Sequence, residues 1–424
     1  MPNETTTATS ATTPAASSPS TRLMSLDALR GFDMFWIMGG DALASALRKL
    51  GTDPVTKEVG NPLLDALTKQ LTHVEWAGFR FYDLIFPLFV FIVGASIVFS
   101  LDRALAQHGT KGALKRVFVR FGVMFAVALF YSGGFTSAWP DIRLLGVLNR
   151  IALCYLGAAL IYCALRHHWR AIAGAAAGLL VGYWALMSFA PFPDLRPVDA
   201  SGQHVSERMT ATNVAQLNWA TTSTLKGTFE PGLNYAHYID QKYLPGKKWE
   251  KTWDPEGILS TLPAIATCLL GVLAGLLLKS QRTQDRRKVV VLLAGGALAV
   301  AAGFLWNAQF PVIKKIWSSS FVLVAGGFSA MLLGAFYQVV DVWKKQSWCQ
   351  VFVWYGMNPI TVYLADNLLS FRSVATRVLG TNVEAFFNQL VTPGFGNLVL
   401  ACGEIGVGML IVWFLYRRRL FLRL

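Results

Sequence analysis

Apolar runs of nearly equal length recur along the whole sequence, and they limit the folds that this chain can adopt. A helix that crosses a lipid bilayer needs about 20 predominantly apolar residues. About ten runs of this length are present, so the sequence predicts an all-α fold, a polytopic membrane helical bundle. The runs cover residues 24–47, 80–101, 117–137, 144–165, 171–190, 257–278, 289–308, 319–340, 350–370 and 396–416.

The composition agrees with a membrane bundle rather than with a soluble domain. Only 15% of the residues are charged and 54% are hydrophobic, whereas soluble domains carry about 25% charged residues. In a soluble protein, a net charge of +14 would suggest nucleic-acid binding. Here much of the lysine and arginine lies in short links between apolar runs, so we expect no nucleic-acid partner.

The short basic links indicate how the bundle is oriented. They follow the even-numbered runs, and arginines also close the C-terminus. Because cytoplasmic loops carry an excess of lysine and arginine, the pattern predicts that both termini are cytoplasmic. Residues 1–21, rich in Thr, Ala, Ser and Pro, are expected to form a disordered tail, which leaves 22–424 as the bundle.

Three longer segments, 48–79, 191–256 and 371–395, fall on the opposite side in this topology. Segment 191–256 is too long for a simple connector, so we expect it to fold as a periplasmic lid or vestibule. Its aromatic residues are typical of sugar-stacking surfaces and equally of anchors at the membrane interface. They are Trp219, Tyr235, Tyr238, Tyr243, Trp249 and Trp253.

Ionisable residues at membrane depth mark the candidate site. His73 stands where a polar segment enters the second apolar run, and Asp83 lies within the first turns of that run. Asp41 lies near the corresponding end of the first run. A histidine beside a carboxylate forms an acid–base pair, so His73 and Asp41 are candidates for proton transfer. Taken alone, however, an interfacial histidine is more often a structural hydrogen-bonding residue.

Two further features point to a polar interior. Arg150, in GVLNR, has no neighbouring charge in its run, so it needs an anionic ligand or an acidic partner such as Asp83 or Asp41. Asn358–Pro359 interrupts the ninth run. Because proline removes a backbone donor and frees a carbonyl group, this break is expected to line a polar cavity.

Two other groups of residues are expected to be structural. Asp27, Arg30 and Asp33 are three residues apart, so they share a helix face and can neutralise one another. The five cysteines include no CxxC pair, and most lie within apolar runs as small apolar residues. No metal site is therefore expected.

Several stretches, taken in order, are similar to one known family. They extend over about residues 22–370, which is nearly the whole bundle. On these stretches the chain resembles the heparan-α-glucosaminide N-acetyltransferase family, which comprises a lysosomal enzyme and bacterial relatives from amino-sugar pathways. The stretches are SLDALRG, HVEWAGFRFYDLIFPLFVFIVG, GVLNR, YID followed by WDPEGILSTLPAI, KKIWSSSF and GMNPITVYL.

The resemblance implies a transmembrane acetyltransferase in a bacterial inner membrane, with acetyl-CoA as co-substrate and no metal. The acetyl group of cytosolic acetyl-CoA would pass to the amine of glucosamine, or of a glucosamine-containing sugar, on the periplasmic side. The protein would be a homodimer in contact with membrane lipid. His73 falls on the family's essential histidine, and Asp41 falls where the lysosomal enzyme has a catalytic asparagine. The residues expected to bind substrate are Trp76, Asp83, Asn149, Arg150, Tyr238, Asp240, Glu256 and Asn358.

Other functions fit parts of the sequence. An amino-sugar transporter would also carry intramembrane charges and a broken helix, although no clear internal repeat is visible. An O-acetyltransferase acting on an envelope polysaccharide would use similar chemistry, whereas a non-catalytic structural protein would leave the pairing of His73 with a carboxylate without a role. For acetyl transfer, His73 would either deprotonate the amine or first take the acetyl group itself. We favour direct transfer, because Asp41 beside His73 suits a general base.

Overall fold

The computed structural model describes residues 23–52, 60–134, 136 and 138–421, and they form a predominantly helical protein. The expected disordered tail at 1–21 lies outside the described residues. The helices are α1 (Met24–Gly51), α2 (Pro62–Gln70), α3 (Phe81–Tyr131), α4 (Val147–Leu165), α5 (Trp169–Phe189), α6 (Tyr235–Tyr243), α7 (Thr261–Lys279), α8 (Asp285–Trp306), α9 (Ser319–Phe336), α10 (Gln350–Met357), α11 (Pro359–Leu369), α12 (Phe371–Leu379), α13 (Val383–Leu390) and α14 (Phe395–Arg417).

Within the described ranges, seven helices are long and apolar enough to cross a membrane, which confirms the prediction of an all-α membrane protein. They are α3, α4, α5, α7, α8, α9 with its extension to Val342, and α14. The other predicted runs take different forms. Residues 81–101 and 117–131 of the second and third predicted runs both lie in α3, whose two helical segments meet at a kink at Gly109 (φ 63°, ψ −174°). The run 350–370 is divided into α10 and α11 at Asn358.

The helix α1 departs from the pattern because it combines length with charge. It has 28 residues, but Asp27, Arg30, Asp33 and Asp41 are spread along it. Arg30 donates to Asp27 at 3.1 Å and to the Ser96 hydroxyl of α3 at 2.6 Å, so part of this charge is neutralised within the bundle. The predicted ion pair of Arg30 with Asp27 is therefore present, whereas the fully buried Asp33 carboxylate has no hydrogen-bond partner among the described residues.

Glycines allow the central helices to pack at close range. A methyl group added at Gly94 of α3 would lie 1.9 Å from the carbonyl oxygen of Cys268 in α7, and one added at Gly271 would lie 1.9 Å from that of Phe91. The two backbones therefore touch where only glycine fits, as small residues permit in membrane bundles. The most apolar stretch of α3 is 72% buried, whereas those of α8 and α14 are only 22% buried. The latter two helices form the periphery of the bundle.

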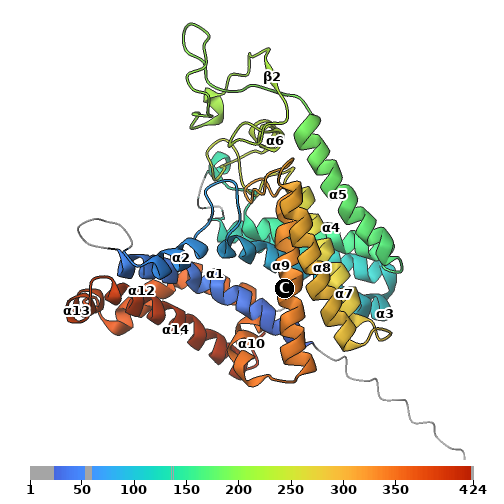
Figure 1. Cartoon of the computed structure of the whole chain (residues 1–424), viewed down its shortest axis with the longest axis vertical. Coiled ribbons are helices and arrows are strands. Elements are labelled where there is room, and N and C mark those ends of the chain that lie inside the picture. The colour runs from blue at the N-terminus through green and yellow to red at the C-terminus, as the bar shows by residue number, and fades with distance from the viewer. Residues whose placement is uncertain (1–22, 53–59, 135, 137, 422–424) are drawn as a thin grey trace, which may run out of the picture.

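Segment 191–256 is folded and lies at one end of the bundle, where β2 is seen beyond the upper end of α5 and α6 beside that end (Figure 1). The strands β1 (Phe192–Pro193) and β2 (Thr224–Leu225) pair antiparallel, with Phe192 opposite Leu225. Leu195, Ala211 and Leu217 form a small buried apolar cluster within this segment. We refer to this segment as the lid.

Candidate active site

A cavity of about 590 Å³ lies where the bundle meets the lid. Its walls come from α1, α3, the residues before and within α4, the segment that precedes α9, α11 and the end of the lid. Pro359, the first residue of α11, lines it, so the break after Asn358 opens onto this space. The polar and aromatic lining residues are Asp41, His73, Tyr82, Phe86, Phe89, Tyr131, Ser132, Arg143, Trp249, Glu250, Glu256, Lys314, Lys315, Trp317, Tyr363 and Asp366.

His73 is held by a buried carboxylate at the start of α3. Its Nδ1 lies 2.9 Å from Oδ1 of Asp83, a residue that is only 1% exposed. The other oxygen, Oδ2, accepts hydrogen bonds from the backbone amides of Val74 at 3.3 Å and Arg80 at 3.1 Å. Asp83 is the third residue of α3, so its carboxylate also caps the exposed amide at the helix N-terminus. A histidine that donates from Nδ1 to a carboxylate keeps the lone pair of Nε2 available as a base.

Lys314 completes this group from a segment 241 residues further along the chain. Its Nζ lies 2.9 Å from Nδ1 and 3.2 Å from Nε2 of His73, and 3.5 Å from Oδ1 of Asp83. Burial lowers the pKa of the Lys314 ammonium, although Asp83 and Glu256 oppose the shift. The segment is fixed to the residues that follow His73 by a hydrogen bond of 2.8 Å from the Gly78 amide to the Val312 carbonyl.

Asp41 reaches the same cavity but does not take the expected position directly beside His73. The carboxylate that contacts His73 is Asp83. Tyr82 stands next to the imidazole, with ring centroids 4.7 Å apart, and its hydroxyl is hydrogen-bonded to Asp41. The cause of the difference is the sharp return of the chain after His73, which brings the N-terminus of α3 to the imidazole. Asp41, on another helix, is linked to this group through Tyr82.

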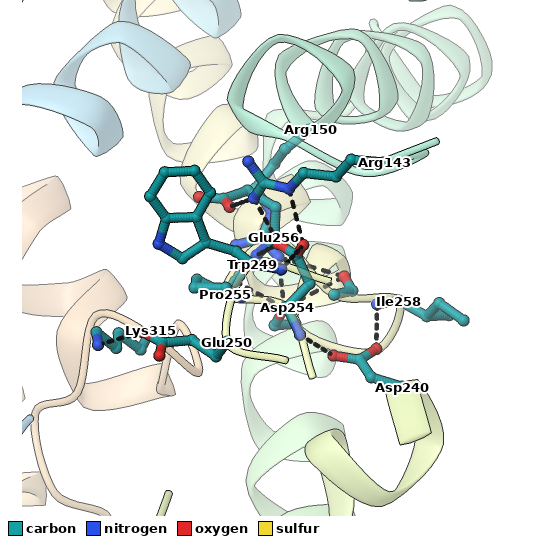
Figure 2. Close-up of polar contacts among 12 residues, drawn as sticks. Arg143, Arg150, Asp240, Trp249, Glu250, Asp254, Pro255, Glu256, Ile258 and Lys315 are labelled. Atoms are coloured by element: carbon teal, nitrogen blue, oxygen red, sulfur yellow. Dashed lines mark hydrogen bonds and ion pairs between the residues drawn. The ribbon is translucent and has the colours of Figure 1, made fainter. Parts of the chain in front are cut away.

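Arg143 anchors the wall formed by the lid, as Figure 2 shows. Arg143 donates from Nε and Nη2 to the two carboxylate oxygens of Asp254 at 2.8 and 2.7 Å, and from Nη2 to Glu256 at 2.7 Å. These ion pairs, formed largely out of water, raise the pKa of Arg143, while burial raises that of Glu256. The Arg143 guanidinium also lies 5.0 Å from the ring centroid of Trp249.

Arg150 is buried, but its contacts differ from the expected ones. Neither Asp83 nor Asp41 pairs with it. Its Nη2 donates to the Gly257 carbonyl at 3.2 Å and to the Ser260 hydroxyl, and the guanidinium lies 5.1 Å from the ring centroid of Trp317. Nε and Nη1 have no hydrogen-bond partner among the residues described, nor does the side-chain amide of the neighbouring buried Asn149. Figure 2 shows Arg150 beside Arg143, above Glu256.

Three of the predicted substrate-binding residues support the lid and do not line the cavity. Trp76 donates from Nε1 to the Phe229 carbonyl at 3.0 Å. Tyr238 stacks on Phe192. Asp240 accepts hydrogen bonds from the backbone amides of Ile258 at 2.8 Å and Asp254 at 3.5 Å, and burial raises its pKa to about 7. Of the predicted residues, His73, Asp41 and Glu256 line the cavity directly, Asp83 contacts His73, and Asn358 is buried next to Pro359.

Sequence reasoning missed Lys314, Lys315, Arg143, Trp249 and Glu250 as members of one site. Lys315 pairs with Glu250 at 2.5 Å, which joins the segment before α9 to the lid. A signal was present for the two lysines, because KKIWSSSF precedes an apolar run at the end of the bundle that holds His73. No three His, Cys, Asp or Glu side chains within the described part of the chain form a group suited to a metal ion.

Comparison with known proteins identifies proteins that are similar to this chain. Residues 63–223, which include His73, Asp83 and Arg143, match the profile described as "Heparan-alpha-glucosaminide N-acetyltransferase, catalytic". The human protein named heparan-alpha-glucosaminide N-acetyltransferase is 26% identical over 330 residues, covering 70% of this chain and 48% of the human protein. The mouse protein is 27% identical over 351 residues, covering 70% of this chain and 49% of its own length.

The chain thus spans about half the length of these relatives. The matched profile begins ten residues before His73 and extends through the bundle into the lid. The predicted resemblance to the heparan-alpha-glucosaminide N-acetyltransferase family is therefore confirmed, over residues 63–223 for the profile and over 70% of this chain for the two relatives.

Proposed function

We propose that this protein is a transmembrane acetyltransferase that moves the acetyl group of acetyl-CoA to the amine of glucosamine or of a glucosamine-containing sugar. The observation that carries the proposal is His73, held at 2.9 Å by the buried Asp83 and open to a cavity of about 590 Å³. A fixed imidazole in a cavity of this size suits a general base. The names of the human and mouse relatives supply the reaction.

In this reaction the amine nitrogen attacks the thioester carbonyl carbon, and Nε2 of His73 takes a proton from the nitrogen. The carbon–nitrogen bond forms and the carbon–sulfur bond breaks. The departing thiolate then receives the proton from the imidazolium, so His73 returns to its neutral form. Asp83 stabilises the imidazolium between these two steps. We favour this direct transfer over an acetyl-histidine intermediate.

The acceptor sugar would bind against the lid side of the cavity. Glu256 and Asp41 line the space, and their side-chain oxygens can accept hydrogen bonds from the amine and hydroxyl groups of the sugar. Trp249 also lines it, is 68% exposed, and offers an indole surface for a sugar ring. Tyr131 and Tyr363, stacked with centroids 4.6 Å apart, form another aromatic part of the wall.

The finer points of the proposal concern the membrane. We propose about ten crossings, with α1 and the α10–α11 pair among them, both termini in the cytoplasm and the lid in the periplasm of a bacterial inner membrane. The basic links support this orientation. The exposed apolar faces of α8 and α14 would contact lipid, and a second copy of the chain would complete a homodimer.

The test is an acceptor screen with purified protein. Acetyl-CoA would be incubated with glucosamine, N-acetylglucosamine or an envelope polysaccharide, and the products would be read by mass spectrometry. The proposal expects N-acetylation of glucosamine, with release of one coenzyme A thiol per acetyl group. Acetylation of hydroxyl groups alone would identify a polysaccharide O-acetyltransferase. If the protein shows no acetyl transfer and no thiol release but takes up the sugar into vesicles, it is a transporter and the proposal is contradicted.

A further inference from the structure

Lys314 holds a position that general-base chemistry at His73 does not explain. The other described cations that line the cavity are occupied by carboxylates. Lys315 pairs with Glu250 at 2.5 Å, and Arg143 pairs with Asp254 and Glu256 at 2.7 Å. Lys314 alone among these cavity cations contacts the imidazole of His73.

The ammonium group of Lys314 is only loosely neutralised. The carboxylate oxygen that it approaches is Oδ1 of Asp83, at 3.5 Å, beyond the usual range for a charge-assisted hydrogen bond. That oxygen already contacts His73 at 2.9 Å, and its partner oxygen accepts from two backbone amides. An ammonium has three donors, and the Lys314 side chain keeps 22% of its surface exposed in the cavity wall. Donor capacity therefore remains for a ligand in the cavity.

The free donors of Lys314 lie close to the place where the thioester carbonyl would react, because the ammonium is near Nε2 of His73. Nζ lies 3.2 Å from Nε2. An amine that gives its proton to Nε2 must itself lie within about 2.6–3.2 Å of it. The carbonyl carbon under attack lies about 3 Å from that amine before the bond forms. The carbonyl oxygen can then lie within hydrogen-bonding distance of the Lys314 ammonium.

The neighbouring polar groups are less suited to hold an oxyanion. Asp41 accepts hydrogen bonds but cannot donate when ionised. The Tyr82 hydroxyl is hydrogen-bonded to Asp41. The full positive charge of Lys314 in a partly buried cavity is the kind of fixed group that stabilises a developing negative charge.

We propose that Lys314 is a further catalytic residue, whose ammonium binds the thioester carbonyl oxygen and the oxyanion that forms there. As the carbon–nitrogen bond forms, the carbonyl electron pair moves to this oxygen beside Lys314 while the amine proton moves to His73. The pair returns as the carbon–sulfur bond breaks, and the imidazolium protonates the thiolate. The inference rests on the proposed acetyltransferase function.

The test compares Lys314→Met and Lys314→Arg with the control Lys69→Met in detergent-purified protein. Lys69 is an exposed lysine of α2, paired with Asp65 at 2.6 Å, and it does not line the cavity. Loss of one oxyanion donor costs about 10²–10³-fold in kcat. We therefore expect Lys314→Met to lose kcat to this degree while KM for both substrates stays within a few-fold. Lys314→Arg should recover part of kcat, and Lys69→Met should match the wild type.

A purely structural lysine would give a different result. In that case Lys314→Met would lower the thermal stability or raise KM and leave kcat within about threefold of the wild type, which would overturn the inference. If Lys314→Met does not fold, chemical labelling of lysines in the wild-type protein tests the inference instead. Trinitrobenzenesulfonate labels free amines, and acetyl-CoA should slow the labelling of Lys314 but not of Lys69. Equal labelling of Lys314 with and without acetyl-CoA would also overturn it.

Acetyl-CoA hydrolysis separates this inference from the proposed function. Water can replace the amine as the attacking group, and the same oxyanion forms. If the wild type hydrolyses acetyl-CoA but acetylates no amino sugar, the proposed acceptor is wrong, and the Lys314 variants are compared by their hydrolysis rates. If the wild type neither hydrolyses acetyl-CoA nor transfers its acetyl group, both proposals are wrong.

Discussion

At the scale of single residues, the proposed chemistry depends on one buried carboxylate with two structural tasks. Asp83 caps the N-terminus of α3 through the Arg80 amide and contacts His73 through its other oxygen. A helix cap and an imidazole partner are thereby combined in a residue that is 1% exposed. The position of His73 is consequently tied to the start of α3.

Asp83→Asn should separate these tasks. The amide keeps the size and one oxygen acceptor for the helix cap, but it lacks the charge that stabilises the imidazolium. We expect acetyl transfer to fall by about 10²–10⁴-fold and acetyl-CoA binding to change little. The matched control is Asp65→Asn in α2, which removes only a surface ion pair with Lys69. Transfer by Asp83→Asn at a rate close to the wild type would show that His73 does not depend on this carboxylate.

The pH dependence of transfer should report on Lys314. Burial lowers its pKa, and the groups that face the ammonium, Asp83, Glu256 and Asp41, favour its charged form. A lysine with a lowered pKa loses its proton as pH rises through a range below about 10.4, the ordinary lysine value. Transfer should therefore decline on the alkaline side, and Lys314→Arg should move this decline to higher pH, because arginine stays protonated. An alkaline limb that is identical in both proteins would contradict this assignment.

At the scale of elements, the lengths of the apolar runs predicted where helices form, but they did not predict the structure of the segments that connect these helices. The predicted basic link from Arg103 to Arg120 is largely helical, because Ala, Leu, Arg and Lys favour helices, but it contains the kink at Gly109 that separates the two helical segments of α3. The charge of this link, not its backbone preference, suggested a loop. The approach of Lys314 to His73 joins segments 241 residues apart, and no local pattern encodes such a contact. By contrast, His73 and Asp41 were predicted because each lies near an end of an apolar run, and Glu256 was predicted from the resemblance of the stretch WDPEGILSTLPAI.

Helix packing offers a matched pair of glycines in α3. A methyl group at Gly94 would meet the Cys268 carbonyl at 1.9 Å, whereas one at Gly122 would meet nothing within 4 Å. Overpacking a tight contact costs about 1–3 kcal/mol, while an unobstructed helical Gly→Ala change stabilises by roughly 0.5–1 kcal/mol. Gly94→Ala should thus lower the thermal unfolding temperature in detergent, and Gly122→Ala should leave it unchanged or raise it. Equal effects of the two changes would contradict the α3–α7 contact.

At the scale of the whole molecule, the site lies at one end of the bundle and the basic links lie at the other in the proposed topology. The lid covers the His73 end (Figure 1). Coenzyme A is strongly anionic and does not cross lipid unaided, so the basic end is its natural point of entry. The two substrates would then approach His73 from opposite sides of the membrane. The cavity, lined by both the bundle and the lid, is the place where they meet.

The most direct test of this account uses sealed vesicles of known orientation that contain the wild type or His73→Ala. With acetyl-CoA supplied on the side of the C-terminus and glucosamine enclosed on the other, the wild type should form N-acetylglucosamine only in the glucosamine compartment. No proton gradient should be required, because thioester cleavage drives the transfer. His73→Ala should reduce the product by about 10²–10⁴-fold. Equal product from His73→Ala, or efficient reaction with both substrates confined to the C-terminal side, would contradict the account.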